Sequence, residues 1–273
     1  MAAKKCLRFK LETMYLANFR KPFSAITILS YSFPPYTTVR GLLANAMGLE
    51  RDDYSLQDKL EISLKPLNKV ERVQNMALMK KLKSPPDAKE RKKLINKLQE
   101  NNHNLDILDD KEKKLYEKLL ILENTSAPFV KEFITPVSCM VYVMGDEKAI
   151  NDLKLSLKTP KRPLYIGSSD DFVIISFDEE KDIFDVPESP NEISDEIDSI
   201  FRITPEIQPV DKKRIIGRVP YKFNVINKKK RDYSREDVIV ASPSEPEQNQ
   251  PNPKLKLNKA VECYKIGDEY ITF

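Results

Sequence analysis

The sequence has few of the residues that metal centres and enzyme active sites most often use. It contains one histidine (His103), no tryptophan, and three cysteines (Cys6, Cys139 and Cys263) that lie far apart. Without a close cysteine pair or a second histidine, a zinc site is not expected, and we predict no metal and no cofactor. Cys6 and Cys139 lie in apolar runs, where a reduced and buried thiol is the expected state.

The motifs of the common catalytic sites are missing as well. There is no GxSxG elbow, no GxxxxGK[ST] loop and no HExxH helix. His103 lies in the polar stretch NNHNLD, where a solvated surface histidine is a more frequent finding than a general base. The carboxylate pairs Asp52-Asp53 and Asp109-Asp110 are interpreted as surface groups. We therefore predict that the chain has no catalytic residue and is not an enzyme.

Long hydrophobic runs are absent too. No apolar run approaches the roughly 18 residues that a membrane span requires, and the N-terminal stretch MAAKKCLRFKLET has no continuous apolar segment. Hydrophobic residues make up 40% of the 273 residues and charged residues 32%, which is typical of a soluble globular protein. We expect a cytoplasmic protein without a membrane partner.

The net charge of +4 is small, but charge is segregated along the chain. Residues 179–206 contain ten acidic residues against two basic ones, a local charge of −8. Residues 211–235 contain ten basic residues against two acidic ones, a local charge of +8. Such segregation suits one surface that neutralises phosphates and another that avoids them, although two solvated loops that pair with each other would give the same pattern.

Hydrophobic periodicity predicts an α+β fold. We expect a helix that follows Thr37 or Thr38 as its cap and ends at Gly48. A helical insertion over residues 67–124 is divided at Pro85-Pro86, and Asp87 is the expected cap of its second helix. An acidic loop over 179–206 and a closing hairpin around Gly267-Asp268 follow. The other expected elements are a helix over 147–157 and strands over 6–16, 25–32, 60–64, 131–144, 171–177, 214–226 and 237–241.

Without the insertion, this order of elements is that of a ferredoxin-like (RRM-like) βαββαβ core, followed by a β-rich C-terminal extension. We place the core in residues 1–180 and the extension, with its acidic and flexible loops, in residues 181–273.

Glycines are scarce and basic residues alternate with aromatic ones. The six glycines include Gly167 and Gly217 beside basic residues, which suits loops that bring backbone amides against phosphates, although a tight turn near lysines would give the same pattern. Four clusters join cations to an aromatic ring, the combination that single-stranded RNA requires for its phosphates and bases: 19–23, 36–40, 161–165 and 218–222. Buried aromatics beside surface cations would look identical, so the residues leave both interpretations open.

Three stretches resemble a known family in order and spacing. YSFPPYTTVRGLLANAMGL (31–49), PFVKEFITPVSCMVYVMGD (128–146) and LKTPKRPLYIGSSD (157–170) are similar to segments of a CRISPR-associated RAMP family, the fifth Cas family. Lys131 stands where that family commonly has arginine. The resemblance covers about the first 180 residues, and the C-terminal third carries no motif that matches.

The resemblance implies a non-catalytic RNA-binding subunit of a type I Cascade ribonucleoprotein complex in antiviral defence. Such a subunit binds the 5′ handle of the crRNA, contacts the backbone subunit and docks the large subunit that reads the PAM, and so meets target DNA indirectly. One branch of the family cuts precursor crRNA itself. An endoribonuclease, which scarce histidine disfavours but Tyr–Lys chemistry leaves open, and a protein-interaction adaptor without an RNA role are therefore the two alternatives.

The predicted RNA-binding residues come from two sources. The resemblance supplies two groups, one at the start of the first helix and one in the loop at 157–170: Tyr36, Thr37, Thr38 and Arg40, then Arg162, Tyr165 and Gly167. Charge and the basic–aromatic clusters alone supply four more: Arg20, Lys21, Arg214 and Arg218.

Overall fold

A computed structural model describes residues 4–22, 27–51, 53, 55–80, 88–122, 126–168, 170–210, 215–227, 230–240 and 254–273. The chain divides into two compact units. The larger unit comprises Met1–Phe23, Leu29–Val73 and Glu132–Phe273, and the smaller unit comprises Ser24–Ile28 and Gln74–Lys131. Within the described residues, no helix is long and apolar enough to cross a membrane.

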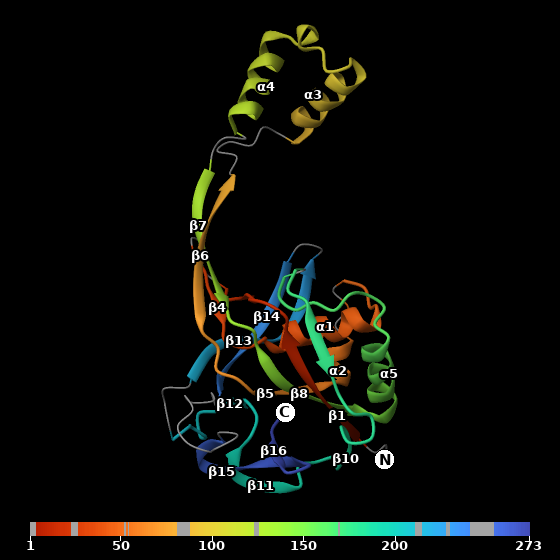
Figure 1. Cartoon of the computed structure of the whole chain (residues 1–273), viewed down its shortest axis with the longest axis vertical. Helices are drawn as coiled ribbons and strands as arrows, with labels where there is room; N and C mark the ends of the chain where they lie inside the picture. The colour runs from red at the N-terminus through yellow and green to blue at the C-terminus, as the bar shows by residue number, and fades with distance from the viewer. Residues whose placement is uncertain are drawn as a thin grey trace. The chain divides into compact units, whose positions relative to one another are not determined.

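An antiparallel sheet with helices on one face forms the centre of the larger unit (Figure 1). Its strands run in the order β10-β1-β8-β5, every neighbouring pair is antiparallel, and β9 also pairs with β1. The strands are β1 (Lys4–Thr13), β5 (Glu61–Pro66), β8 (Ser138–Asp146), β9 (Val173–Ser176) and β10 (Ile183–Val186). The predicted strands near 6–16, 60–64 and 171–177 are thus confirmed.

Two helices cover one face of this sheet, α1 (Tyr36–Met47) and α5 (Glu147–Lys158), and the short α2 (Leu56–Lys59) follows α1. Alternate residues of β1 point into this helical layer, as the period of a strand requires: Leu7, Phe9 and Leu11. Gly48 ends α1 in the left-handed conformation (φ 72°), as predicted. The cap prediction at the other end is wrong, because Pro35 is the N-cap and Thr37 and Thr38 lie in the first turn.

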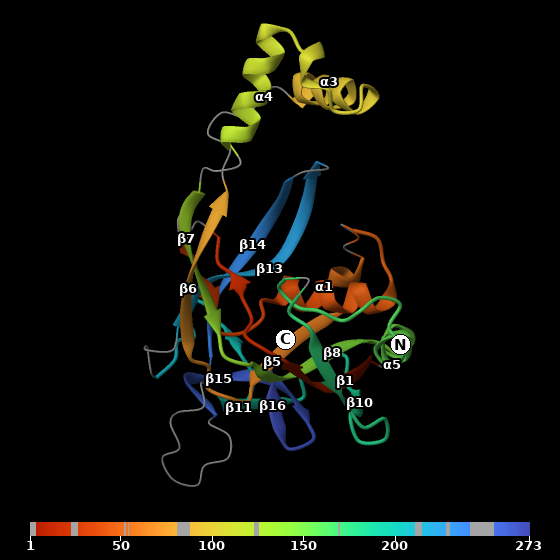
Figure 2. The same ribbon diagram turned by 45° about the horizontal axis from the view of Figure 1, so that its top comes forward.

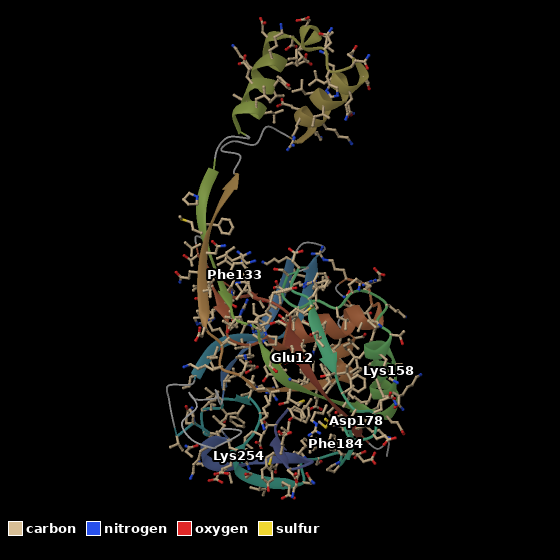
Figure 3. The ribbon with its side chains drawn as sticks, viewed as in Figure 1. Glu12, Phe133, Lys158, Asp178, Phe184 and Lys254 are labelled. Carbon is tan, nitrogen blue, oxygen red and sulfur yellow. The ribbon has the colours of Figure 1, made fainter. Side chains whose placement is uncertain are left out.

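The opposite face of the sheet is covered by the C-terminal hairpin of β15 (Leu255–Ile266) and β16 (Glu269–Ile271) (Figure 2). Cys6 and Tyr142 from the sheet pack against Tyr264 and Ile266. On the same face Arg8 lies over the ring of Phe184, 5.0 Å from its centroid. Phe184 is labelled in Figure 3. The predicted closing hairpin around Gly267-Asp268 is confirmed.

The predicted acidic loop over 179–206 is wrong, because three strands lie within it. β10 pairs with β1, β11 (Glu192–Ile197) pairs with β15, and β12 (Phe201–Arg202) pairs with β14 (Lys230–Ile239). Each has its partner far away in the sequence, so local composition did not reveal it. A long hairpin of β13 (Ile215–Asn227) and β14 (Lys230–Ile239) completes this region, and β14 contains most of the short strand predicted over 237–241.

The smaller unit contains strands as well as helices. The sheet β3-β7-β6 is built from β3 (Thr27–Ile28), β6 (Arg72–Lys80) and β7 (Ser126–Ile134). The helices are α3 (Ala88–Glu100), a 3₁₀ turn (Leu105–Ile107) and α4 (Asp110–Leu122). The predicted helical insertion over 67–124 is therefore wrong at its start, where β6 is a strand, and Asp87 lies outside the described residues.

Two further differences concern extended segments. The predicted strand over 131–144 is two strands, β7 and β8, because Pro136 lies at the break between them. The extended segment predicted over 25–32 contains β3 and β4 (Ser30–Tyr31), and β4 pairs with β2 (Phe19–Arg20). The domain boundary at residue 180 stays a prediction.

Candidate nucleic-acid interface

Two adjoining hollows lie between the start of α1, the loop after α5 and the β13–β14 hairpin, all in the larger unit. Their volumes are about 330 and 320 Å³. Five residues line both of them, so we treat the two as one groove, the α1 groove: Thr37, Gly41, Tyr165, Phe223 and Arg231. The start of α1 and the loop after α5 contain residues that were predicted to bind RNA. The groove residues of the hairpin, such as Phe223 and Arg231, were not predicted.

The first turn of α1 supplies a polar edge of the groove. Thr37 and Thr38 both line it, and the backbone N–H of Thr38 donates to the carbonyl of Pro35 at 2.9 Å. The first turn has no acidic residue, so the positive end of the helix dipole is not offset there. At Gly41 an added Cβ would meet no atom within 4 Å, so open space begins at this backbone position.

The loop after α5 is fixed to the end of α1. The side chain of Asn45 donates to the carbonyl of Pro163 at 2.6 Å, and the guanidinium of Arg162 donates to the carbonyl of Leu49 at 2.8 Å. Arg162 also lies 3.4 Å from the carboxylate of Glu50. Arg162 therefore holds the loop in place and still lines the groove with part of its exposed side chain.

Tyr165 and Gly167 follow in the same loop. Tyr165 is 38% exposed and lines the groove, so its ring is not a core residue. Gly167 has φ +86°, and an added Cβ there would lie 2.8 Å from the carbonyl oxygen of Asn18. Only glycine fits this close approach without strain, and it fixes the path of the loop beside Tyr165.

The β13–β14 hairpin provides the aromatic wall. Phe223 and Tyr233 are directly opposite each other, with ring centroids 6.1 Å apart. Arg231 lies over the ring of Phe223 at 4.9 Å, and Arg235 lies over the ring of Tyr233 at 5.7 Å. The side-chain amide of Gln57 holds the backbone of Phe223 from both sides, donating to its carbonyl at 2.8 Å and accepting from its N–H at 3.1 Å.

Tyr36 and Arg40 lie largely in the interior, and Arg40 also lines the groove. They are 2% and 5% exposed, and both contact the ring of Tyr221, Tyr36 edge-on at 5.2 Å and Arg40 through its guanidinium at 5.2 Å. Burial lowers the pKa of Arg40 and raises the pKa of Tyr36. Nη1 of Arg40 donates to the carbonyl of Tyr221, whereas Nε and Nη2 are buried without a hydrogen-bond partner among the described residues.

Of the residues that were predicted from charge alone, Arg20, Lys21 and Arg218 do not line the groove. Lys21 lies over the ring of Tyr31 at 5.4 Å, and the hydroxyl of Tyr31 donates to the carbonyl of Arg218 at 2.6 Å. Arg20 is exposed in β2, and the N–H of Arg218 donates to Asp237 at 2.7 Å. Arg214 lies outside the described residues. The structure therefore does not bring this set together with Tyr165.

A comparison of the sequence with models of protein families identifies the family of the chain. The family model described as "CRISPR-associated protein (Cas_Cas5)" matches residues 6–240. This chain belongs to that family. The match extends past residue 180, so it includes the β13–β14 hairpin, which the motif comparison did not reach. Among curated proteins, none matches.

Two solved structures are similar to this Cas5 chain at low identity. One is a chain of a "CRISPR RNA-guided surveillance complex", with 13% identity, a TM-score of 0.49, and coverage of 85% of this chain and 88% of that one. The other is a CRISPR protein from Archaeoglobus fulgidus, with 13% identity, a TM-score of 0.45 and coverage of 97% of both chains. Both TM-scores are below 0.5, so the family assignment rests on the sequence match.

The one histidine of this Cas5 chain does not line the α1 groove. His103 is exposed in the smaller unit, in the turn after α3, and its N–H donates to the carbonyl of Leu98 at 2.7 Å. The described residues contain no group of three or more side chains that could hold a metal ion. The α1 groove offers cations, hydroxyls and aromatic rings, together with the amides of Asn45 and Gln57 and the carboxylates of Glu50 and Asp53.

Sequence reasoning missed three residues of the groove, Phe223, Arg231 and Tyr233. Their signal was present in the stretch KFNVINKKKRDYSRE, where aromatic residues and cations occur on either side of a run of lysines. Only the pairing register, which places Phe223 opposite Tyr233, shows that they form one surface.

Proposed function

We propose that this Cas5 chain is a non-catalytic, cytoplasmic RNA-binding subunit of a type I CRISPR complex that serves antiviral defence, and that it holds the 5′ handle of the crRNA in the α1 groove. The observation that carries the proposal is the composition of that groove. Phe223, Tyr233 and Tyr165 offer rings beside Arg231, and the first turn of α1 offers hydroxyls and the positive end of a helix.

These groups suit single-stranded RNA in particular. Unpaired bases stack on aromatic side chains, at about 1–3 kcal/mol per base, while arginine and helix N-termini bind the phosphates between them. Tyr36 and Arg40 support the groove, since both are buried against the ring of Tyr221. Arg162 positions the loop that carries Tyr165.

We also infer that the sheet β10-β1-β8-β5 is a ferredoxin-like core. Its strand order and antiparallel pairing suit the βαββαβ arrangement, with α1 between β1 and β5, and α5 between β8 and β9. In RNA-recognition motifs the open face of this sheet stacks RNA bases. Here the C-terminal hairpin covers that face, which is why we assign the RNA to the groove beside α1.

The proposed partners follow from the family. We propose that the chain contacts the backbone subunit of the complex and docks the large PAM-reading subunit, and so meets target DNA indirectly. RNA binding is expected to need no metal and no cofactor, because cations of the chain itself face the groove.

The proposal is tested by mixing the purified full chain with single-stranded repeat RNA of the matching CRISPR array. We expect binding without a metal ion and no cleavage of the RNA. Tyr165→Ala should weaken binding about five-fold to 150-fold, since loss of one stacked base costs about 1–3 kcal/mol. Tyr15→Ala is the matched control, because Tyr15 is 70% exposed and does not line the α1 groove.

Three outcomes would contradict the proposal. Defined cleavage in the presence of EDTA would indicate the endoribonuclease. Absence of RNA binding, by the chain alone and within its assembled complex, would indicate the adaptor. Equal binding by Tyr165→Ala and Tyr15→Ala would place the RNA elsewhere on the chain.

A further inference from the structure

A hollow separate from the α1 groove lies in the smaller unit, between α3 and α4. It has a volume of about 430 Å³. The two helices are held together by a small apolar cluster of Leu94, Leu98 and Leu108, with Leu115 and Leu119 packed against it. The hollow is therefore part of a folded helical hairpin. Its lining consists mainly of residues that lie outside this apolar cluster. We call it the α3–α4 groove.

Lysines dominate the lining of this groove. Lys111, Lys114 and Lys118 come from α4, and Lys93 faces them from α3. The three positions on α4 are spaced i, i+3 and i+7, so they lie along one face of the helix and span about 10 Å of its axis. All four lysines belong to exposed positions, and none pairs with a carboxylate among the described residues.

The two acidic residues of the lining, Glu90 and Glu112, do not cancel this charge. Glu112 is already occupied, since Lys97 donates to its carboxylate at 2.5 Å and the N–H of Asp109 donates to it at 3.0 Å. These hydrogen bonds lower the pKa of Glu112, so it stays ionised and engaged with partners of its own. Of the acidic lining residues, only Glu90 is left to offset the charge of the four lysines. The groove therefore has a net positive charge, which favours binding of an anion with several charges.

The kind of anion follows from what else lines the groove. Its remaining members are Leu94 and Leu115, so the described lining contains no aromatic ring and no side-chain amide. Rings and amides are the groups that stack on bases or read their edges, and lysine contacts phosphate as a point charge. A duplex presents about one phosphate charge per 1.7 Å of its axis, so several phosphates match the length of the lysine row.

We propose that the α3–α4 groove binds the phosphodiester backbone of duplex nucleic acid without regard to its sequence. This site is separate from the α1 groove, and the proposal goes beyond the binding of single-stranded handle RNA. The α1 groove offers rings for splayed bases, whereas the α3–α4 groove offers only a row of cations.

The test is a binding titration of the full chain with a short, fluorescently labelled, blunt-ended DNA duplex. Binding is measured by fluorescence anisotropy at several salt concentrations. A matched RNA–DNA hybrid and a single-stranded RNA serve as the other two probes. The variant Lys111→Gln/Lys114→Gln/Lys118→Gln should weaken duplex binding by about tenfold or more at low salt. It should also reduce the slope of log affinity against log salt by about 3, one for each lost phosphate contact.

The control variant Arg91→Gln/Lys92→Gln/Lys113→Gln removes the same charge from exposed positions of the same two helices that do not line the groove. It should bind the duplex nearly as the unmodified chain does. Glutamine has almost the helix propensity of lysine, so both variants should keep their helices. A version of the test variant with arginine in place of the three lysines keeps the charge and should therefore retain duplex binding.

Equal duplex binding by the test and control variants would overturn the proposal, and so would an unmodified chain whose duplex binding does not depend on salt. Loss of single-stranded RNA binding alone in the test variant would contradict it too. If the test variant instead loses a protein subunit of its complex and keeps the duplex, the lysine row is a protein-docking surface. Tyr165→Ala should leave duplex binding unchanged, which separates this site from the α1 groove.

Discussion

Replacing Lys65 should destabilise the larger unit, because Lys65 is the buried cation between the central sheet and the C-terminal strands. Its Nζ lies 3.2 Å from Asp198 and 2.6 Å from Glu269. The side chains of Lys65 and Asp198 are only 4% and 3% exposed. Glu269 also accepts from the hydroxyl of Tyr142 and lies 3.6 Å from Arg8.

The size of the effect follows from what each carboxylate keeps after the change. In Lys65→Met, Glu269 retains Arg8, whereas Asp198 retains the N–H of Tyr270 at 3.0 Å and has no cation among its described partners. Breaking a buried ion pair from one side costs about 3–5 kcal/mol, which corresponds to a melting temperature lower by roughly 6–20 °C.

The assay is urea and thermal denaturation followed by far-UV circular dichroism, since the chain has no tryptophan. The double variant Lys65→Met/Asp198→Asn removes the stranded charge and keeps an acceptor for Tyr270, so it should regain about 2 kcal/mol or more. Lys181→Met is the control, because Lys181 is 80% exposed and its surface pair is worth less than about 0.5 kcal/mol. A Lys65→Met variant as stable as the control would refute the reasoning, as would a double variant less stable than Lys65→Met.

Three other predictions concern a tyrosine, a glycine and the smaller unit. Burial raises the pKa of Tyr36, so the native state keeps a proton that the unfolded state releases, and stability should fall as the pH rises above about 10. In Tyr36→Phe the slope of unfolding free energy against pH should be smaller by up to about 1.4 kcal/mol per pH unit, and an unchanged slope would contradict the assignment. Gly167→Ala should lower the unfolding free energy by about 1–3 kcal/mol, because the new Cβ meets the carbonyl of Asn18 at 2.8 Å; a neutral effect in chemical denaturation would argue against this close approach. Replacing residues 88–122 by a short glycine–serine linker should leave the cooperative melting of the larger unit intact, because its apolar clusters contain no residue from that range, whereas assembly of the complex should suffer; loss of soluble, cooperatively melting protein would show otherwise.

Elements whose signals are local could be predicted from the sequence. The helix before Gly48 has its apolar spacing and its left-handed cap within a dozen residues, and the alternation of β1 is complete within one strand. Elements that depend on distant partners could not. β6 was predicted as helix because its partner β7 lies about 50 residues later. The acidic segment was not predicted to contain β10, β11 and β12, because these strands pair with β1, β15 and β14, respectively, which lie far away in the sequence.

The candidate site was predictable to the same extent. Thr37 and Tyr165 were found because each lies in a short motif with its own local signal. Phe223 and Tyr233 were not found, since only the hairpin register places them opposite each other. The burial of Arg40 was also beyond the sequence, because it depends on the ring of Tyr221, which lies 181 residues away.

The central claim, that the α1 groove holds the crRNA handle, is tested most directly by ultraviolet cross-linking. The complex would be purified with its native crRNA and irradiated, and the cross-linked peptides would be identified by mass spectrometry. The account predicts that handle nucleotides are joined to the peptides that contain Tyr165, Phe223 and Tyr233. Handle cross-links confined to exposed aromatic residues outside the groove, such as Tyr15, would contradict it.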